Sequence, residues 1–335
     1  NWTIQGPAEP LTTGPGMKLF VSVANDNHFF FTDMRIYFDV WGISAKPDEG
    51  IFLSDPQKLT SDRMQKFDPS ITHDGTNIAY SAFGGVQTAK YELRMRNLTT
   101  GQESTIPTQA NTFSFIPRFN PDGSLITYRD FISNHWGSFV FPIGSGSRSE
   151  ICDSCFILDF YPDKDYALVQ VDSNKLEKMN LRDKEMSTIF AIEMGSITDA
   201  SLCPDGQWIS YLTMEPDGRA AIWIAPLKES PVPSDKKTLI IEDNHYLSRP
   251  DWSLNGSYLY FLAQKKDHFS IFTQKLNPLT KEPLGEAQEV YFSPDTKFHL
   301  NFPLGNGTIG VAADKIIFHV CEMTGNIFLA RPKSR

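Results

Sequence analysis

Apolar and polar residues alternate over short segments all along the chain, which is the period expected of β-strands with one buried face. The clearest segments read NIAYSA, LITYRD, YALVQV, WISYLT and YLYFLA. Each comes just after a turn of the Asp-Gly type, and a second alternating segment usually follows about ten residues later. Long helical periodicity is nearly absent. The pattern therefore predicts an all-β protein.

The turns repeat along the chain at one position of a common unit. Gly75, Gly123, Gly206 and Gly256 occupy that position, and Asp165 is expected to fill it in a degenerate copy. A two-residue hairpin needs positive φ at its centre, which Asp, Asn and Gly tolerate best, so the motif builds structure and is not a binding site by itself. A spacing of roughly 40 to 50 residues is typical of propeller blades.

Two weaker copies flank these five, which makes seven, the last of them incomplete. We therefore predict a single domain, a seven-bladed β-propeller of four-stranded antiparallel blades, with six blades as the alternative. The predicted blades span approximately residues 17–62, 63–112, 113–155, 156–195, 196–246, 247–297 and 298–335 plus 1–14. The N-terminal strand, Trp2 to Thr13, is expected to lie beside Asn326 to Ala330 and so to close the ring.

The net charge and the lengths of the apolar runs exclude some classes of binding partner. The chain has 335 residues, is 40% hydrophobic and carries a formal net charge of -9. That charge argues against binding to nucleic acid or to an anionic membrane surface. No apolar run approaches the length of a membrane span, so direct membrane insertion of this segment is not expected. The first residues lack the zones of a signal peptide and an initiator Met, so we expect a piece of a longer protein.

The segments PSITHDGTNIAYSA, PRFNPDGSLITYRD, ASLCPDGQWISYLT and PDWSLNGSYLYFLA resemble the WD40-like, or TolB-type (PD40), β-propeller repeat. The second half is most similar to the C-terminal propeller of acidobacterial multidomain serine/threonine kinases and winged-helix signalling proteins. That resemblance implies the sensor or docking end of a larger bacterial protein. TolB itself is usually six-bladed, so seven copies would depart from it. Neither a glycine-rich ATP loop nor HRD or DFG is present in the sequence.

Signatures of catalysis and metal binding are weak. The seven His residues are scattered without a pair at metal-ligand spacing. The segment GSGSRS, from Gly144 to Ser149, does not fit the spacing of a nucleophile elbow, and no segment is left for a hydrolase domain. We therefore predict neither enzymatic activity nor a cofactor or metal for this segment.

Cys152 and Cys155 form a C-x-x-C motif without a second pair. In an oxidising compartment they could close a small disulfide loop; otherwise they are a pair of thiols. A redox motif would need a helix N-terminus, and no helix is evident.

Charged residues recur where the chain enters the innermost strand of each predicted blade. In propellers these entries line the mouth of the central channel, where charges from separate blades converge as a ligand pocket requires. The alternative is that the charges pair with one another and close the channel, or that they bond the backbone at the strand entry. The candidate ligand-binding residues are Asp68, Arg118, Asp159, Asp199, Arg249, Asp251 and His299.

Together these patterns predict a non-catalytic propeller that senses a small ligand or docks a protein. The alternatives are the accessory, substrate-gating propeller of a peptidase or glycan-processing enzyme, and a TolB-like periplasmic adaptor. An extracytoplasmic location is favoured, with the cytoplasm as the alternative. The sequence does not identify the ligand, because propeller function resides in loops.

Overall fold

A computed structural model describes residues 17–24, 28–62, 64–84, 91–109, 112–132, 134–228, 231–243, 245–265, 268–293, 298–300 and 308–330. The chain divides into two compact units, Phe38–Cys321 and a second made of Asn1–Tyr37 with Glu322–Arg335. Within the described ranges, one short 3₁₀ turn, Ser234–Lys236, is the only helix. No helix among these residues is both long and apolar enough to span a bilayer.

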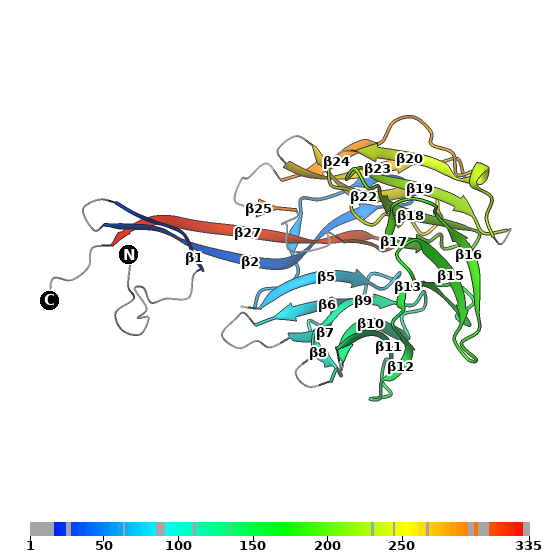
Figure 1. Ribbon diagram of the computed structural model, residues 1–335, viewed down its shortest axis with the longest axis horizontal. Helices are drawn as coiled ribbons and strands as arrows, with labels where there is room; N and C mark the ends of the chain where they lie inside the picture. The colour runs from blue at the N-terminus through cyan, green and yellow to red at the C-terminus, as the bar shows by residue number, and fades with distance from the viewer. Residues whose placement is uncertain are drawn as a thin grey trace, which may run out of the picture. The chain divides into compact units, whose positions relative to one another are not determined.

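Five four-stranded antiparallel sheets form the blades of the unit Phe38–Cys321 (Figure 1). The first and second blades consist of β5 (Gln65–Ile71), β6 (Asn77–Phe83), β7 (Tyr91–Asn97) and β8 (Glu103–Ile106), and of β9 (Ser114–Phe119), β10 (Leu125–Ile132), β11 (His135–Pro142) and β12 (Ser149–Asp153). The third consists of β13 (Phe156–Phe160), β14 (Tyr166–Gln170), β15 (Lys175–Asn180) and β16 (Met186–Ala191). The fourth and fifth consist of β17 (Ser196–Leu202), β18 (Trp208–Met214), β19 (Ala220–Pro226) and β20 (Thr238–Asp243), and of β21 (Asp251–Trp252), β22 (Tyr258–Lys265), β23 (His268–Lys275) and β24 (Gln288–Phe292).

Glycine fills the predicted turn position between the first two strands of four blades. The φ angles of Gly75, Gly123, Gly206 and Gly256 are 74°, 70°, 68° and 66°. Residues with a Cβ rarely adopt this backbone conformation. In the third blade the equivalent residue is Lys164 (φ 64°), and the sequence-based alignment of Asp165 to this position is wrong. Lys164 donates its backbone N–H to the carbonyl of Tyr161 just as each glycine does in its own turn.

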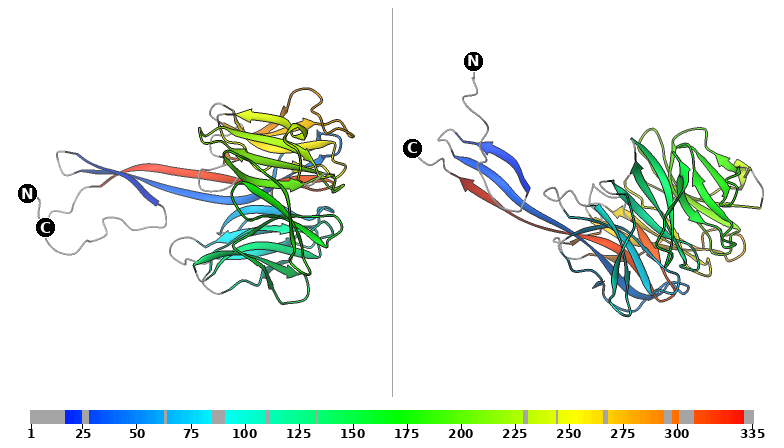
Figure 2. Two further views of the ribbon diagram at one scale, coloured as in Figure 1. Left: turned by 45° about the vertical axis from the view of Figure 1, so that its right-hand side comes forward. Right: turned by 90° about the horizontal axis from the view of Figure 1, so that it is seen from below.

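The first strand of each blade is innermost, and the blades pack side by side (Figure 2). β5 contacts β9, β13 contacts β17, and β17 contacts β21. The buried apolar side chains fall into clusters that each join two adjacent sheets, such as the one that links Leu158 and Phe190 of the third blade to Ile209 and Tyr211 of the fourth. Stability thus comes mainly from packing between neighbouring blades.

The predicted number of blades, seven with six as the alternative, is wrong, because the structure has five. The strands assigned to the first and last predicted blades share one seven-stranded sheet. It contains β1 (Met17–Val23), β2 (Phe29–Lys46), β3 (Ile51–Phe52), β4 (Gln57–Lys58), β25 (Phe298–His299), β26 (Ile309–Val311) and β27 (Lys315–Ala330). The two flanking repeats are weak because each supplies only part of this sheet.

The seven-stranded sheet completes the ring, since β26 contacts both β5 of the first blade and β21 of the fifth. In this sheet β2 is the neighbour of β27. The predicted closing strand, Trp2 to Thr13, lies outside the described residues. The pairing that joins the two ends of the chain among the described residues is therefore that of β2 with β27, and β2 comes later in the sequence than the predicted closing strand.

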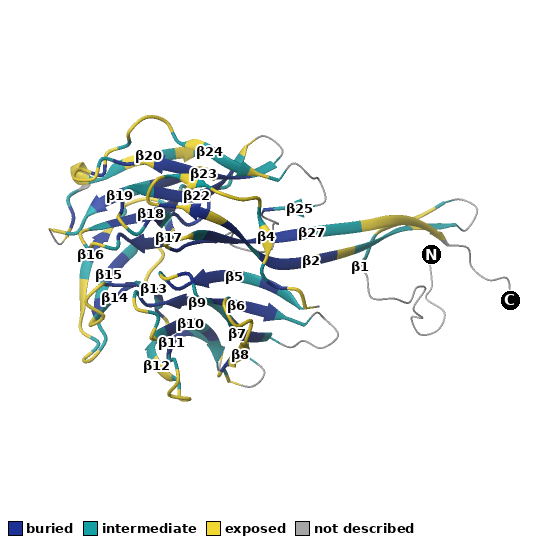
Figure 3. Ribbon diagram, turned by 180° about the vertical axis from the view of Figure 1, so that it is seen from behind, coloured by how far each residue is buried: buried dark blue, intermediate teal, exposed yellow. Residues whose placement is uncertain are grey.

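The second unit is made of β1 and of the outer parts of β2 and β27. Its strands carry exposed apolar side chains, including Phe20 and Ile327, which are 82% and 79% exposed. Figure 3 shows β27 changing from buried to exposed along its length.

Candidate functional site

Charged side chains gather where the inner strands begin. The register between the first and second strands shifts at Phe67/Ser70 in the first blade, at Ile157/Asp159 in the third and at Ile197/Asp199 in the fourth. Such β-bulges re-aim side chains. Asp68, in the first of these irregularities, has a φ of 51°. The bulges thus turn Asp68, Asp159 and Asp199 out of the regular alternation of their strands.

Arg249 holds the part of the site formed by the third, fourth and fifth blades. Its Nη2 lies 3.3 Å from Oδ2 of Asp159, and its Nε lies 3.4 Å from Oδ1 of Asp199. Nε also donates to the carbonyl of Ala200 at 3.2 Å. The Arg249 side chain is 7% exposed and both carboxylates are half-buried, so these are largely buried ion pairs that link three blades.

Two of the aspartates also bond the backbone of a neighbouring sheet. Asp159 accepts the N–H of Leu202 in the fourth blade at 2.9 Å. Asp251 accepts the N–H of Val311 in β26 at 3.1 Å. The predicted alternative, in which charges at the strand entries pair with one another or bond the backbone, therefore describes this part of the site.

Arg118 and Arg129 occupy the other part, formed by the first and second blades together with Asp68. Arg118 is 5% exposed; its Nη1 donates to the carbonyl of Pro117 at 3.1 Å, and its buried Nη2 has no hydrogen-bond partner. Arg129 stacks its guanidinium 4.1 Å from the ring centre of Phe156, and its buried Nε has no partner. Among the described residues, neither guanidinium has a carboxylate within 4 Å.

The pKa shifts of Arg118 and Arg249 differ in direction between the two parts of the site. Burial raises the pKa of Asp68 to about 6, although Arg118 and Arg129 oppose the shift. Burial and the positive charge of Arg249 lower the pKa of Arg118 to about 10. Burial would also lower the pKa of Arg249, but Asp199, Asp251 and Asp159 reverse that effect and raise it. Ionisation is therefore favoured for Arg249 and costly for Asp68 and Arg118. Burial makes Asp251, on the paired side, costly to ionise as well, since it raises the pKa of that carboxyl.

Six of the seven predicted residues therefore belong to one electrostatic network. These are Asp68, Arg118, Asp159, Asp199, Arg249 and Asp251. His299 is half-buried in β25, a neighbour of β27, and shares no ion pair or charge interaction with the six in the described part of the chain. Arg129 was missed because it lies on a second strand, where its alternating position was the only available signal.

Cys152 and Cys155 form a disulfide where the second blade leads into the third. Next to it, one ligand atom each from His135, Glu150 and Asp153 lie within 4.8 Å of one another. Imidazole and carboxylate groups are ligands of divalent transition metals. Glu150 and Asp153 are exposed, however, and the group lies on the two outer strands of its blade.

The comparisons with known proteins agree with this architecture. A family model described as TolB beta propeller domain (PD40) matches residues 75–300. No curated protein matches the chain. A putative TolB from Agrobacterium tumefaciens is similar in structure, with a TM-score of 0.66, 12% identity, and coverage of 87% of this chain and 99% of that one.

Two further solved structures have the same fold at low identity. TolB from Acinetobacter baumannii has a TM-score of 0.58 and 13% identity, over 75% of this chain and 65% of that one. An oligogalacturonate lyase from Vibrio parahaemolyticus has a TM-score of 0.52 and 12% identity, over 92% and 98%. Identities this low show the fold alone. Because the family model covers well over half of the sequence, this chain belongs to the TolB β-propeller domain (PD40) family.

Proposed function

We propose that this propeller is a non-catalytic docking module whose centre accepts an anionic group, such as the carboxylates of an acidic segment in a partner protein. The observation that supports the proposal is the pair of buried, unpartnered guanidinium nitrogens, Arg118 Nη2 and Arg129 Nε. A buried donor left without a partner costs about 1–3 kcal/mol, and more when the group is charged. An anion at this place would remove that cost.

The charge balance of the site supports the same polarity. Arg249 is already neutralised by Asp159 and Asp199. The first and second blades carry two guanidinium groups, Arg118 and Arg129, against one carboxylate of their own, Asp68, whose pKa burial raises to about 6. Asp199 of the fourth blade also stabilises both cations. Arg pairs with carboxylates and phosphates in a planar, two-pronged geometry, so an anionic group is the natural partner for either side chain.

A larger bacterial signalling protein, with this chain as its sensing end, remains our proposal for the biological setting, and we place the chain outside the cytoplasm. The disulfide between Cys152 and Cys155 supports that location, since disulfides persist in oxidising compartments. An accessory propeller of a peptidase or glycan-processing enzyme is the competing reading, because the fold also serves an enzyme, the oligogalacturonate lyase.

Binding to three probes tests the docking proposal: succinate, inorganic phosphate and a synthetic tetra-aspartate peptide. Calorimetric titration of the wild-type chain should show binding of at least one probe, weakened at least about tenfold by Arg118→Met. Arg182→Met is the matched control, because Arg182 is an exposed residue paired with Asp165. The proposal is wrong if none of the probes binds, or if Arg118→Met binds as the wild type does while keeping its fold.

A further inference from the structure

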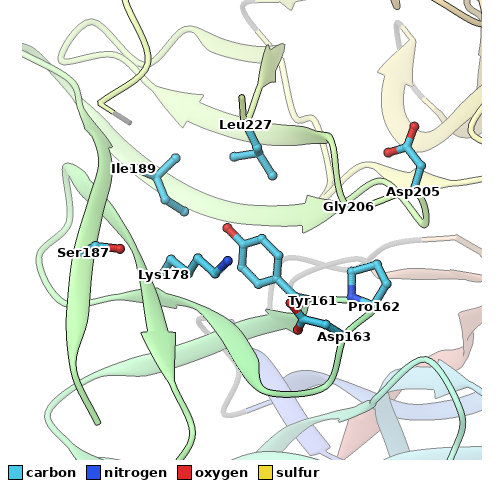
Figure 4. A pocket seen from close by; sticks show the side chains of 9 residues that line it. All are labelled: Tyr161, Pro162, Asp163, Lys178, Ser187, Ile189, Asp205, Gly206 and Leu227. Atoms are coloured by element: carbon cyan, nitrogen blue, oxygen red, sulfur yellow. The ribbon is translucent and has the colours of Figure 1, made fainter. Parts of the chain in front are cut away.

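A pocket of about 430 Å³ lies between the third and fourth blades, at the end where their first turns lie (Figure 4). That volume falls in the range of small-molecule sites. Residues from both blades line it, among them Tyr161, Asp163, Lys178, Ile189, Asp205 and Leu227. Figure 4 shows the Lys178 side chain extending toward the ring of Tyr161, with Ile189 and Leu227 beyond the ring's hydroxyl end. None of these residues belongs to the charged network at the centre.

The repeats of this chain show what the position of Tyr161 ordinarily does. Its equivalents in the first, second and fifth blades are Thr72, Asn120 and Ser253. Each of them accepts, through its side chain, the backbone N–H of the residue five positions later, at 3.0, 2.8 and 3.0 Å. The fourth blade has the buried Cys203 at this position, which accepts no such bond among the described residues. Tyr161 makes no such bond in the third blade either. There its side chain leaves the turn and lines the pocket instead.

The position of Lys178 departs from the repeat in the same way. Lys178 lies opposite Leu168 in the pairing of β14 with β15. In the other blades the equivalent residues of the third strand are Met95, Val140, Ile224 and Thr273. None of these four carries a charge. The third blade thus replaces an uncharged residue by an ammonium group at the wall of the pocket.

Both departures place hydrogen-bond donors in the pocket without giving them acceptors. The Lys178 ammonium lies 4.5 Å from the ring centre of Tyr161 and 3.9 Å from that of Tyr166. Within the described residues no carboxylate lies within 4 Å of it. The Tyr161 hydroxyl makes no hydrogen bond there either, and burial raises its pKa, so it keeps its proton. The rings hold the ammonium by cation–π attraction, which leaves its N–H groups for a further partner.

Acceptors lie on the same pocket. Asp163 and Asp205 each use one oxygen to accept the backbone N–H two residues later, at 3.2 and 2.8 Å. Their other oxygens retain acceptor capacity, since an ionised carboxylate accepts at both oxygens. Ile189 and Leu227 add apolar surface. The pocket therefore combines a cation with a phenol, two carboxylates and an apolar wall.

We propose that this pocket binds a small zwitterion, an apolar amino acid or a short peptide. The ligand's carboxylate would bind Lys178 and Tyr161, its ammonium would bind Asp163 or Asp205, and its side chain would pack on Ile189 and Leu227. This site is separate from the docking centre, so either proposal can fail without the other.

Calorimetric titration with L-leucine and L-leucyl-L-leucine tests the proposal. We expect at least one of them to bind with a Kd between about 10 µM and 1 mM, the range of weak to moderate ligand affinity. Two analogues locate the polar contacts. Leucinamide lacks the carboxylate and 4-methylpentanoate lacks the ammonium, and each should bind at least about tenfold more weakly.

The variants are taken from the sister blades so that they keep the fold. Lys178→Met introduces the residue of the first blade, and Tyr161→Ser introduces that of the fifth. Each should weaken binding at least about tenfold. Lys275→Met is the control: Lys275 lies 6.0 Å from the ring centre of Tyr258 and does not line the pocket. Its binding should match the wild type.

Three results would overturn the inference. One is the absence of binding by both leucine probes at millimolar concentration. Another is undiminished binding by folded Lys178→Met. The last is equal binding of leucine and 4-methylpentanoate, which would mean that the pocket recognises no ammonium and takes apolar carboxylates instead of zwitterions.

Discussion

The two parts of the central network contain the same kinds of side chain but use them differently. In the third to fifth blades, Arg249 has two carboxylates within 3.4 Å and a carbonyl acceptor. In the first and second blades, Arg118 is as deeply buried and Arg129 is half-buried, and each has an unpartnered buried nitrogen. The first arrangement ties blades together, whereas the second costs stability. Buried charge alone therefore does not indicate function, and the unpaired part is where a ligand would act.

The largest effect should come from breaking the paired part. Arg249→Met leaves Asp159 and Asp199 without their cation, and removing one partner of a buried ion pair costs about 3–5 kcal/mol. Urea unfolding at neutral pH would measure the loss. If the free energy of unfolding falls by less than about 1 kcal/mol, these ion pairs are as weak as pairs at the surface. The paired part would then stabilise the fold no more than the unpaired part does.

Asp68 should give the next largest effect, as a dependence on pH. Its pKa is about 6 in the folded chain against 3.8 for an ordinary aspartate, so the folded state resists its ionisation. Protonated Asp68 therefore adds about 3 kcal/mol to the free energy of unfolding. This gain is complete below about pH 3.8 and is lost as the pH rises through 6. Urea unfolding of wild type and Asp68→Asn from pH 3.5 to 7.5 should show this loss in the wild type only. Parallel profiles would contradict the prediction.

Arg118→Met should have the smallest effect on stability. Because this guanidinium has no carboxylate partner among the described residues, we expect the free energy of unfolding to stay constant or rise by up to about 1 kcal/mol. The comparison with Arg249→Met under identical conditions gives the contrast directly. Equal destabilisation by both substitutions would show that Arg118 is a structural residue like Arg249.

The general architecture could be predicted from the sequence because it depends on local patterns. Asp-Gly turns and alternating strands specify four-stranded blades, and the four turn glycines all have the predicted positive φ. The blade number could not be obtained in this way. It depends on β2 and β27 sharing a sheet, a pairing between segments far apart in the sequence, each with only a weak copy of the repeat.

The candidate site was partly predictable for the same reason. Residues at strand entries could be assigned to the centre from the repeat alone, and six of the seven join one network. His299 lies in β25 of the irregular sheet, apart from that network, and its part in binding stays a prediction. Tyr161 and Lys178 gave no signal, since their significance appears only when the cross-strand register aligns them with small or uncharged residues of the other blades.

The pairing of β2 with β27 also has a consequence for biosynthesis. During translation, Ile43 and Ala45 leave the ribosome long before Ile316 and Phe318, so the apolar cluster that these four residues share stays incomplete until β27 has been made. At ordinary rates of synthesis the delay is on the order of tens of seconds. Nascent chains that stall before Lys315 would expose β2 without its partner strand, and we expect chaperones to bind them.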